Sequence, residues 1–322
     1  MHIMIQNTLY TKICNKSRRD ENYFIYAMKK TKIFKGAATA LITPFSDGEI
    51  DYRALGGLID FQIESNIDAL VIGGTTAEAA TLSDEERYKL YTFAKGKIAG
   101  RTKLILGTGT NDTRVALAHT KFAERLGCDG VLLVTPYYNK GTEDGIEKHY
   151  LKIADSTNLP IIVYNVPSRT GVNLGINLLD RLSEHPNIVG LKEASDSTDR
   201  LVTLASFGEK LQLYSGNDSQ IFPTLALGGD GVISVMSNII PRTTKVLCQS
   251  YFEGNRDYSL ALQLRLLPFI KSLFIETNPS PIKYIMSEHG LCLPEVRLPL
   301  SEPRESTKSA IKSSFEGIKD LF

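Results

Sequence analysis

The chain has 322 residues, 42% of them hydrophobic, and a formal charge of +1 at pH 7. This length suits one large domain, or two modest ones, with a substantial hydrophobic core. The balanced charge argues against nucleic acid or a membrane surface as a partner, and without a run of 18 apolar residues the sequence predicts no membrane span. The scattered cysteines and histidines argue against a disulfide framework or a structural metal site and favour a cytoplasmic protein.

Residues 1–27 differ from the rest of the chain. They mix polar, basic and aromatic residues without a clear period, and they lack the apolar core of a secretory signal. Asp20 and Glu21 argue against an organellar transit peptide. Met28 stands shortly before an apolar strand and resembles a natural start. We therefore interpret residues 1–27 as an N-terminal extension without a function.

From residue 37 onward, an apolar strand, a polar turn and an amphipathic helix recur as a unit. Strands that alternate with helices predict a parallel sheet with helical crossovers. The predicted strands cover residues 38–43, 69–72, 104–107, 131–134, 161–164, 188–191, 211–214 and 231–235. Eight units in about 225 residues match the size of a closed (β/α)8 TIM barrel. A doubly wound open sheet is the alternative, but Gly-x-Gly-x-x-Gly does not follow the first strand.

Capping residues and apolar faces in the sequence predict several helices. Ser83 begins a capping box, and Val115, Ala118, Phe122 and Leu126 line one face of a helix that ends at Gly127. Beyond the barrel, helices are predicted near residues 258–274 and 281–289, and a last one carries an apolar stripe formed by Ala310, Ile311, Phe315 and Ile318. We therefore expect a barrel over residues 28–254 and a small C-terminal helical subdomain over residues 255–322.

The chemistry of such a barrel is expected just after each strand, at the C-terminal ends. Polar residues follow five of the strands at 73–78, 135–139, 164–171, 192–194 and 215–217. The Gly-rich segment 227–231 precedes the last strand, so we interpret it as a tight loop at the opposite end and not as a phosphate cradle.

Lys192 is the most informative of these residues, because it ends an apolar strand that reads as buried. An ordinary lysine has a pKa of about 10.4, and desolvation by apolar walls lowers it. A partly neutral lysine attacks carbonyl carbons and forms Schiff bases, which predicts covalent catalysis on a keto substrate. The alternative is a structural lysine that extends from the strand end to solvent or a carboxylate.

The neighbouring strand ends supply groups that a Schiff base requires. Imine formation needs a proton donor and acceptor, and the phenol of Tyr164 suits both tasks. Thr75 and Tyr138 extend this group into a hydroxyl relay, and Thr76 in its Gly-rich turn is a candidate for holding a small carboxylate. Arg169 is a candidate for binding a second carboxylate. Each has a structural alternative: a core tyrosine, a turn threonine or a surface ion pair.

Four motifs in this order resemble the dihydrodipicolinate synthase family of class I pyruvate-dependent aldolases. They are Gly-Thr-Thr-x-Glu at 74–78, Thr-Pro-Tyr-Tyr-Asn at 135–139, Tyr-Asn-Val-Pro-Ser-Arg-Thr-Gly at 164–171 and Gly-Leu-Lys-Glu-Ala at 190–194. The resemblance covers essentially residue 33 to the C-terminus. It implies an enzyme of lysine and diaminopimelate biosynthesis that condenses pyruvate with L-aspartate 4-semialdehyde, in the cytoplasm, as a homotetramer built from two dimers, without a metal or organic cofactor.

The resemblance also implies roles for individual residues. Lys192 would form the Schiff base with pyruvate, and Tyr164, Thr75 and Tyr138 would relay protons, with Tyr138 reaching the site of a neighbouring subunit. Thr76 and the backbone at Ile233 would hold pyruvate, and Arg169 would bind the carboxylate of aspartate semialdehyde. Gly216, after the seventh strand, is a further substrate-binding candidate.

The chain departs from the family pattern in two places. Ala77 stands where the family usually has glycine, so the turn after Thr76 must avoid a positive φ or accept strain. Family members that lysine inhibits strongly often have a histidine and a glutamate at the positions of Arg87 and Val115. We therefore expect weak inhibition by lysine or none, although Asn111 and Tyr137 remain.

Two other functions compete with the synthase. A sugar-acid aldolase, of the N-acetylneuraminate lyase or 2-keto-3-deoxy acid type, shares the lysine and the tyrosine. Arg169 favours the synthase, because a small aldehyde that carries a carboxylate calls for a cation. A barrel that binds pyruvate without catalysis is the second alternative, and the complete relay argues against it.

Overall fold

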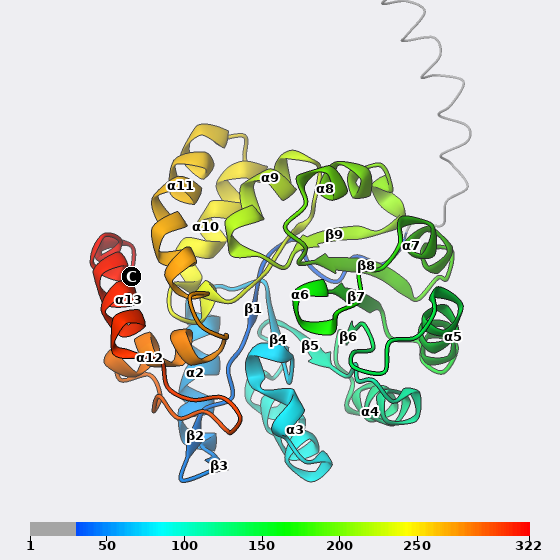
Figure 1. Ribbon diagram of the computed structural model, residues 1–322, viewed down its shortest axis with the longest axis horizontal. Helices are drawn as coiled ribbons and strands as arrows, with labels where there is room; N and C mark the ends of the chain where they lie inside the picture. Colours follow the sequence, from blue (N-terminus) through cyan, green and yellow to red (C-terminus); the bar gives the residue numbers. More distant parts are fainter. Residues whose placement is uncertain (1–29) are drawn as a thin grey trace, which may run out of the picture.

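The computed structural model describes residues 30–322, so the predicted extension 1–27 and Met28 lie outside the described residues. Eight parallel strands close into a barrel, in the order β1-β10-β9-β8-β7-β6-β5-β4 (Figure 1). Their bounds are Gly36–Ala40 (β1), Ala69–Ile72 (β4), Lys103–Gly107 (β5), Gly130–Val134 (β6), Ile161–Asn165 (β7), Ile188–Glu193 (β8), Gln212–Ser215 (β9) and Gly231–Ser234 (β10). The predicted closed barrel is confirmed, and the doubly wound open sheet is excluded.

The first strand differs most from its prediction. It was expected over residues 38–43 but ends at Ala40, because an asparagine side chain takes over the hydrogen bonding of the backbone that follows. The Ile42 N–H donates to Oδ1 of Asn238 at 3.0 Å, and the Asn238 amide donates to the Ala40 carbonyl at 2.8 Å. A short hairpin of β2 (Phe45–Ser46) and β3 (Glu49–Ile50), which the sequence did not indicate, comes next.

Helices surround the barrel, as Figure 1 shows. They are α2 (Tyr52–Glu64), α3 (Asp84–Ile98), α4 (Thr113–Leu126), α5 (Glu143–Ala154), α6 (Pro167–Thr170), α7 (Ile176–Ser183), α8 (Thr198–Ala205), α9 (Ile221–Ala226) and α10 (Pro241–Phe252). The predicted capping box of α3 is confirmed, since Ser83 Oγ accepts from the Glu86 N–H and Glu86 Oε2 accepts from the Ser83 N–H. Within residues 30–322, no helix combines the length and apolarity needed to cross a bilayer.

Helix α4 ends at Gly127 as predicted, but its predicted buried face is wrong. The buried residues are Ala116, His119, Thr120 and Ala123, whereas Ala118 is exposed. Small side chains on the inner face let the helix approach the sheet closely. The larger apolar groups lie at the side of the helix, where Phe122 stacks on Tyr88 of α3 at 4.1 Å.

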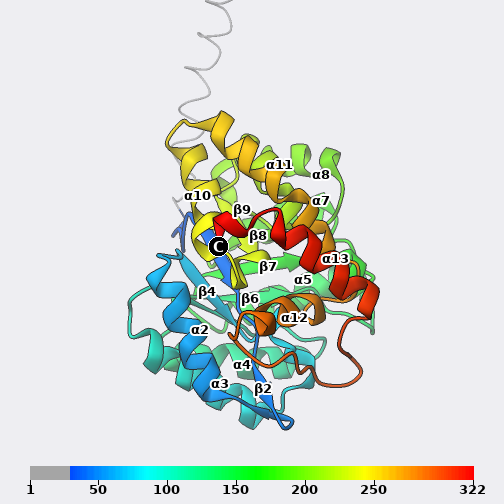
Figure 2. The ribbon, with the colours of Figure 1, turned by 90° about the vertical axis from the view of Figure 1, so that its left-hand side faces the viewer.

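Three further helices, α11 (Arg256–Ser272), α12 (Ser280–Glu288) and α13 (Glu305–Glu316), follow the barrel. Figures 1 and 2 show them together on one side of the molecule, where α11 packs on α10 and α13 contacts both α11 and α12. Of the stripe predicted for the last helix, Ile311, Phe315 and Ile318 are buried. The predicted helices are therefore present, and the division at residue 255 stays a prediction.

The core has two parts, as a barrel requires. One cluster lies between the strands and the outer helices. The other fills the barrel interior and includes Ile162, Tyr164, Tyr214 and Ile233. Because successive residues of a strand point to opposite sides, each strand contributes to both clusters. The interior cluster packs beneath the residues at the C-terminal ends of the strands and supports them.

Candidate active site

A cavity of about 490 Å³ lies at the C-terminal ends of the strands, where the sequence predicted the chemistry. Its wall is built from the segments that follow β4, β5, β6 and β7, together with the C-terminal segment around Asn278. Thr75, Tyr164 and Arg169 line it. The structure therefore brings three of the predicted site residues together in one concave site.

Lys192 lies near the end of β8, and only 5% of its surface is exposed. It is not among the residues that line the cavity, but it is paired across the strands with Tyr164, which lines it. Its Nζ lies 4.2 Å from the centre of the Tyr164 ring. Burial lowers the pKa of Lys192 from 10.5 to about 7, with Asp218 acting in the opposite direction and Arg169 in the same direction as burial. A pKa near 7 leaves about half of the amine neutral at neutral pH. This burial excludes a lysine that extends to solvent, which is one of the two structural alternatives.

Tyr164 pairs with Lys192 in register across β7 and β8. Burial raises the pKa of its phenol, and the neighbouring Arg169 and Thr75 act to lower it. The phenol is therefore protonated at neutral pH and has a proton to give beside the lysine. This arrangement suits general acid and base chemistry on a group attached to Nζ.

The turn after β4 carries both predicted threonines. Thr75, Thr76 and Ala77 form a single turn of 3-10 helix, and the Thr76 hydroxyl accepts a hydrogen bond of 3.0 Å from the Asn278 side chain. Ala77 does not have a positive φ; the next residue, Glu78, has a φ of 56°. The chain thus accommodates alanine by placing the left-handed residue one position later.

Arg169 lies on the short helix α6 and also contacts the C-terminal segment. Its Nη2 donates to the backbone carbonyl of Asn278 at 2.8 Å. A guanidinium has five N–H donors, so others remain for a substrate carboxylate. The Asn278 residue therefore touches two of the predicted substrate-binding side chains at once.

Gly216, which follows β9, and Ile233, which lies in β10, are the two remaining candidates for substrate binding. A Cβ at Gly216 would come within 2.7 Å of the Ala194 Cβ and 3.1 Å of the Lys192 Cε, so only glycine fits beside the lysine stem. Ile233 is fully buried in the barrel interior, in the same cluster as Tyr164. Gly216 thus lies against the lysine stem, and the contacts of Gly216 and Ile233 with a substrate stay a prediction.

Tyr138 is a predicted relay residue that does not line the cavity. It is 89% exposed, and its φ of 70° is unusual for a residue with a side chain. Its neighbour Tyr137 is half-buried and lines the cavity. The chain holds Tyr138 outward at the cost of local backbone strain.

Two residues of the site were missed in the sequence. Asn278 lies just before the helix predicted near residues 281–289, in a segment for which the sequence predicted no role in the site. Asp218 stands one residue beyond the predicted polar segment after β9, and its Oδ2 accepts from the N–H groups of Val235 and Met236 at 3.0 and 2.8 Å. A search that extended one turn past every strand would have found Asp218, whereas Asn278 has no local signal.

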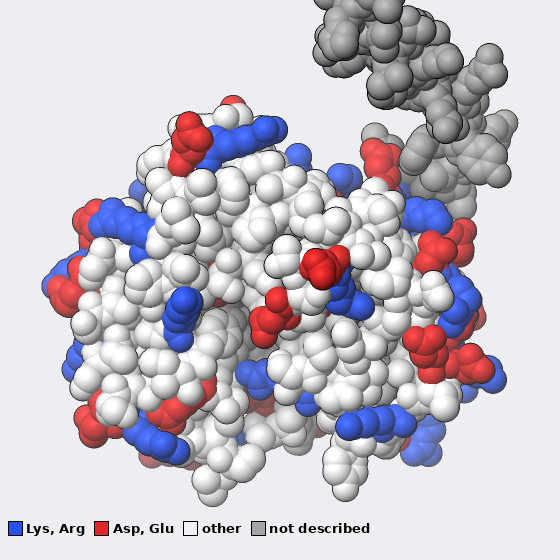
Figure 3. All heavy atoms as spheres, turned by 45° about the horizontal axis from the view of Figure 1, so that its top comes forward, with Lys and Arg blue, Asp and Glu red and all other residues white. Residues whose placement is uncertain are grey.

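The charged surface around the site is mixed. On the face shown in Figure 3, Lys and Arg side chains alternate with Asp and Glu, and the surface is hollowed near its centre. Among residues 30–322, no three His, Cys, Asp or Glu side chains gather in a group that could hold a metal ion. The predicted site residues carry an amine, a phenol, hydroxyls and a guanidinium.

Comparison with known proteins places this geometry in a family. Residues 33–317 match the sequence profile of the Dihydrodipicolinate synthetase family. The 4-hydroxy-tetrahydrodipicolinate synthase of Clostridium novyi (strain NT) is 44% identical over 285 residues, which is 88% of this chain and 96% of that protein. The synthase of Alkaliphilus oremlandii (strain OhILAs) is 45% identical over 280 residues, 87% of this chain and 97% of that protein.

Solved structures agree with the sequence relatives. The 4-hydroxy-tetrahydrodipicolinate synthase of Methylacidiphilum fumariolicum SolV superposes with a TM-score of 0.87 at 42% identity and covers 89% of this chain and 96% of its own. The dihydrodipicolinate synthase of Thermotoga maritima gives a TM-score of 0.88 at 40% identity, over 90% of this chain and all of its own. The chain, with its buried lysine beside a tyrosine in a TIM barrel, belongs to the dihydrodipicolinate synthetase family.

Proposed function

We propose that this chain is a 4-hydroxy-tetrahydrodipicolinate synthase, a lyase that condenses pyruvate with L-aspartate 4-semialdehyde on the route to diaminopimelate and lysine. The observation that carries the proposal is the buried Lys192, whose pKa is lowered to about 7 and whose Nζ lies 4.2 Å from the Tyr164 ring. The names of the relatives at about 44% identity support the substrate pair.

The proposed reaction uses the residues of the site in order. The neutral Lys192 amine attacks the keto carbon of pyruvate, and Tyr164 gives the proton with which water leaves the carbinolamine. Loss of a methyl proton turns the resulting imine into an enamine, whose carbon attacks the aldehyde and forms the new carbon–carbon bond. The substrate amine then displaces the Lys192 amine and closes the ring. Thr75, next to Tyr164 on the cavity wall, extends the proton path.

Substrate binding follows from the charges and hydroxyls of the cavity. We assign Thr76 and the backbone near Ile233 to pyruvate, and Arg169 to the carboxylate of the aldehyde. We also assign Gly216 to substrate binding, because a Cβ there would come within 3.1 Å of the Lys192 Cε. Arg169 is supported by its position in the cavity wall and by its free donors.

The sugar-acid aldolase is the weaker assignment. The relatives that match most of this chain are named as synthases, and the solved structures are dihydrodipicolinate synthases. Arg169 in the cavity wall favours a small anionic aldehyde over a sugar chain with many hydroxyls.

The proposal also covers the oligomeric state of the protein and its location in the cell. We assign the chain to a homotetramer of two dimers, in which the exposed Tyr138 completes the site of a neighbouring subunit; its 89% exposure and strained backbone support this. A cytoplasmic location is supported by free thiols at Cys128, Cys248 and Cys292.

Borohydride reduction in the presence of pyruvate tests the mechanism, and consumption of aspartate semialdehyde tests the substrate. A pyruvyl adduct on the peptide that contains Lys192, absent in Lys192→Ala, is expected. Turnover of aspartate semialdehyde without turnover of N-acetylneuraminate would separate the synthase from the sugar lyases. A folded protein that gives no adduct would overturn the mechanism.

A further inference from the structure

A second pair of residues lies directly beyond the reactive pair. Tyr164 faces Lys192 across β7 and β8, and the next pair in register is Asn165 with Glu193. Because successive residues of a strand point to opposite sides, this second pair points away from the barrel interior, toward the outer helices. Both residues are fully buried. A carboxylate in such a place is costly unless its oxygens are bonded and its charge is compensated.

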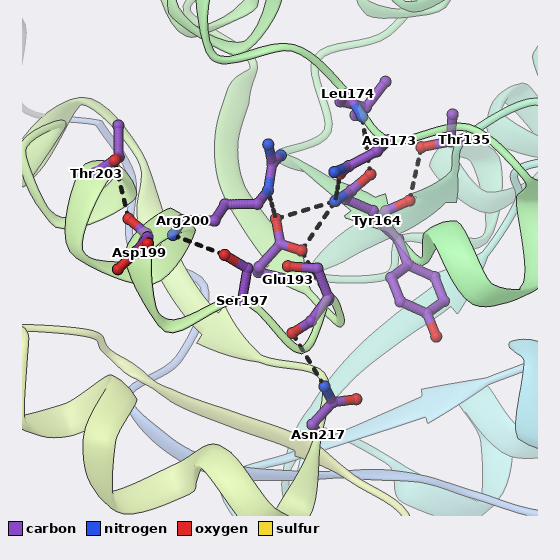
Figure 4. Close-up of polar contacts among 12 residues, drawn as sticks. Thr135, Tyr164, Asn173, Leu174, Glu193, Ser197, Asp199, Arg200, Thr203 and Asn217 are labelled. Carbon is purple, nitrogen blue, oxygen red and sulfur yellow. Dashed lines mark hydrogen bonds and ion pairs between the residues drawn. The ribbon is translucent and has the colours of Figure 1, made fainter.

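The carboxylate of Glu193 is bonded at both oxygens. Oε1 accepts from the Ser195 N–H and from Nδ2 of Asn165, each at 2.8 Å. Oε2 accepts from Nε of Arg200 on α8 at 2.9 Å and from the same Asn165 amide at 3.1 Å. Figure 4 shows Glu193 connected to Arg200, with the Tyr164 ring directed away from these contacts. The charge is therefore compensated by the guanidinium of α8.

Backbone hydrogen bonds also join the ends of the neighbouring strands at this position. The Ala194 N–H donates to the Asn165 carbonyl at 2.9 Å, and the Gly216 N–H donates to the Glu193 carbonyl at 2.7 Å. The side chain of Asn165 also accepts from the Leu174 N–H at 3.1 Å and donates to Asn173 at 2.8 Å. The ends of β7, β8 and β9 are thus connected immediately after the residues that carry the chemistry.

We propose that Asn165, Glu193 and Arg200 are positioning residues of the reaction, which fix the end of β8 against β7 so that the Lys192 amine stays against the Tyr164 ring. The inference rests on the proposed Schiff-base function. None of the three lines the cavity, so they act through the backbone of the reactive residues. A buried ion pair here fixes the position of the strand end but adds little to the free energy of unfolding, because the cost of desolvating both charges offsets much of their attraction.

The physical reason is the sensitivity of the reaction to distance. The Lys192 amine bonds to the keto carbon of pyruvate, and the Tyr164 phenol must reach the hydroxyl on that same carbon. A displacement of either group by about 1 Å costs on the order of a hundredfold in rate. Lys192 has a long flexible stem, so its position depends on where the strand end holds its Cα. A strand end that was free to shift would also admit water to the amine, which raises its pKa toward the ordinary value.

The decisive variant is the double replacement Glu193→Gln with Arg200→Gln, which removes both charges together and keeps an amide at each position. We expect the rate of borohydride trapping of pyruvate at pH 7 to fall on the order of tenfold to a hundredfold. In the double variant, the pH at which the trapping rate falls to half should move to higher pH, while the KM for aspartate semialdehyde changes little. The single variant Arg200→Lys keeps the ion pair with Glu193, so its trapping rate should lie close to that of the wild type.

The matched control lies at the other end of the same strand. Asn187 precedes β8, and its amide donates to the carbonyls of Ala154 and Thr157 at 3.2 and 2.7 Å. Asn187→Ala also removes strand-end hydrogen bonds, so it should lower thermal stability and leave the pH profile of trapping unchanged. This variant separates positioning of the lysine from a general loss of stability.

Two results would overturn the proposal: a folded double variant with the wild-type trapping rate and pH profile, or the same shift in the Asn187 control. If the double variant fails to fold, Asn165→Ala, which keeps the ion pair, takes its place. A smaller shift in the same direction is expected for it, and a wild-type profile would overturn the proposal. Wild-type protein that does not trap pyruvate would instead remove the proposed function itself.

Discussion

The Nζ of Lys283 lies 2.5 Å from Oε1 of Glu78, and the two side chains are 0% and 1% exposed. Lys283 belongs to α12 of the C-terminal subdomain, whereas Glu78 is the left-handed residue that follows the Thr75–Ala77 turn. The second oxygen of Glu78 accepts from the Arg297 N–H at 2.8 Å. The C-terminal subdomain therefore holds the strained end of the turn that carries two predicted site residues.

Breaking this ion pair is expected to damage both stability and catalysis. Lys283→Met leaves the Glu78 carboxylate buried without its counter-charge, which costs about 3–5 kcal/mol of unfolding free energy. Adding Glu78→Gln should restore part of the stability, since no buried charge remains, but should not restore kcat because the turn loses its anchor. Denaturant unfolding and steady-state kinetics measure the two effects. Lys89→Met, which breaks the exposed pair with Glu85, is the control and should change neither.

The acid limb of the activity profile should report Lys192. Its pKa is lowered to about 7, mainly by burial, and the attacking form is the neutral amine. The trapping rate with pyruvate should therefore fall as the pH drops through about 7 and level off above it. Asp218 acts to raise this pKa and Arg169 to lower it. Asp218→Asn should accordingly move the midpoint to lower pH, and a wild-type midpoint near the ordinary lysine value would contradict the assignment.

Arg169 should discriminate between the two substrates. Arg169→Leu removes the proposed partner of the aldehyde carboxylate, so kcat/KM for aspartate semialdehyde should fall on the order of a hundredfold, the scale of a lost charge-assisted hydrogen bond. Trapping of pyruvate should survive. Since Arg169 also lowers the pKa of Lys192, the trapping midpoint should shift slightly upward. Equal losses in both assays would argue that Arg169 serves the whole site and not one substrate.

Tyr138 should act in the neighbouring subunit. Tyr138→Phe and Lys192→Ala are each expected to be nearly inactive alone. Mixed and reassembled, they should regain about a quarter of wild-type activity, because half of the random dimers are hybrids and each hybrid has one complete site. Recovery that is absent despite confirmed hybrid assembly would place Tyr138 in its own subunit's site or outside the mechanism.

Lysine should inhibit weakly or not at all. Arg87 is buried on the cavity wall, where its Nη2 donates to the Ala79 carbonyl at 2.6 Å and its Nη1 to the Tyr91 hydroxyl at 3.3 Å. Val115 lines the same wall and offers no carboxylate to a cationic effector. An inhibition titration with lysine checks this, and tight, cooperative block would contradict it. Arg87→His with Val115→Glu should increase the sensitivity, since both positions line the same wall.

Local sequence patterns predicted much of the fold and of the site. Apolar runs of strand length between amphipathic helices predicted the barrel, because period and length are properties of neighbouring residues. Lys192 and Tyr164 could be chosen because they directly follow such runs, and a parallel barrel gathers all strand ends at one face. The buried face of α4 was predicted incorrectly, because Ala116, His119, Thr120 and Ala123 face the core and the larger apolar residues lie at the side of the helix.

Contacts between distant segments could not be predicted in this way. Asn278 meets Thr76 across 202 residues, and Lys283 meets Glu78 across 205. The sequence by itself determined which residue types end each strand, hence the amine and the phenol. Only the tertiary structure decided how deeply Lys192 is buried, which lowers its pKa, and which residues hold the Thr75–Ala77 turn. Burial and long-range pairing depend on the packing of the whole chain, and no local pattern specifies it.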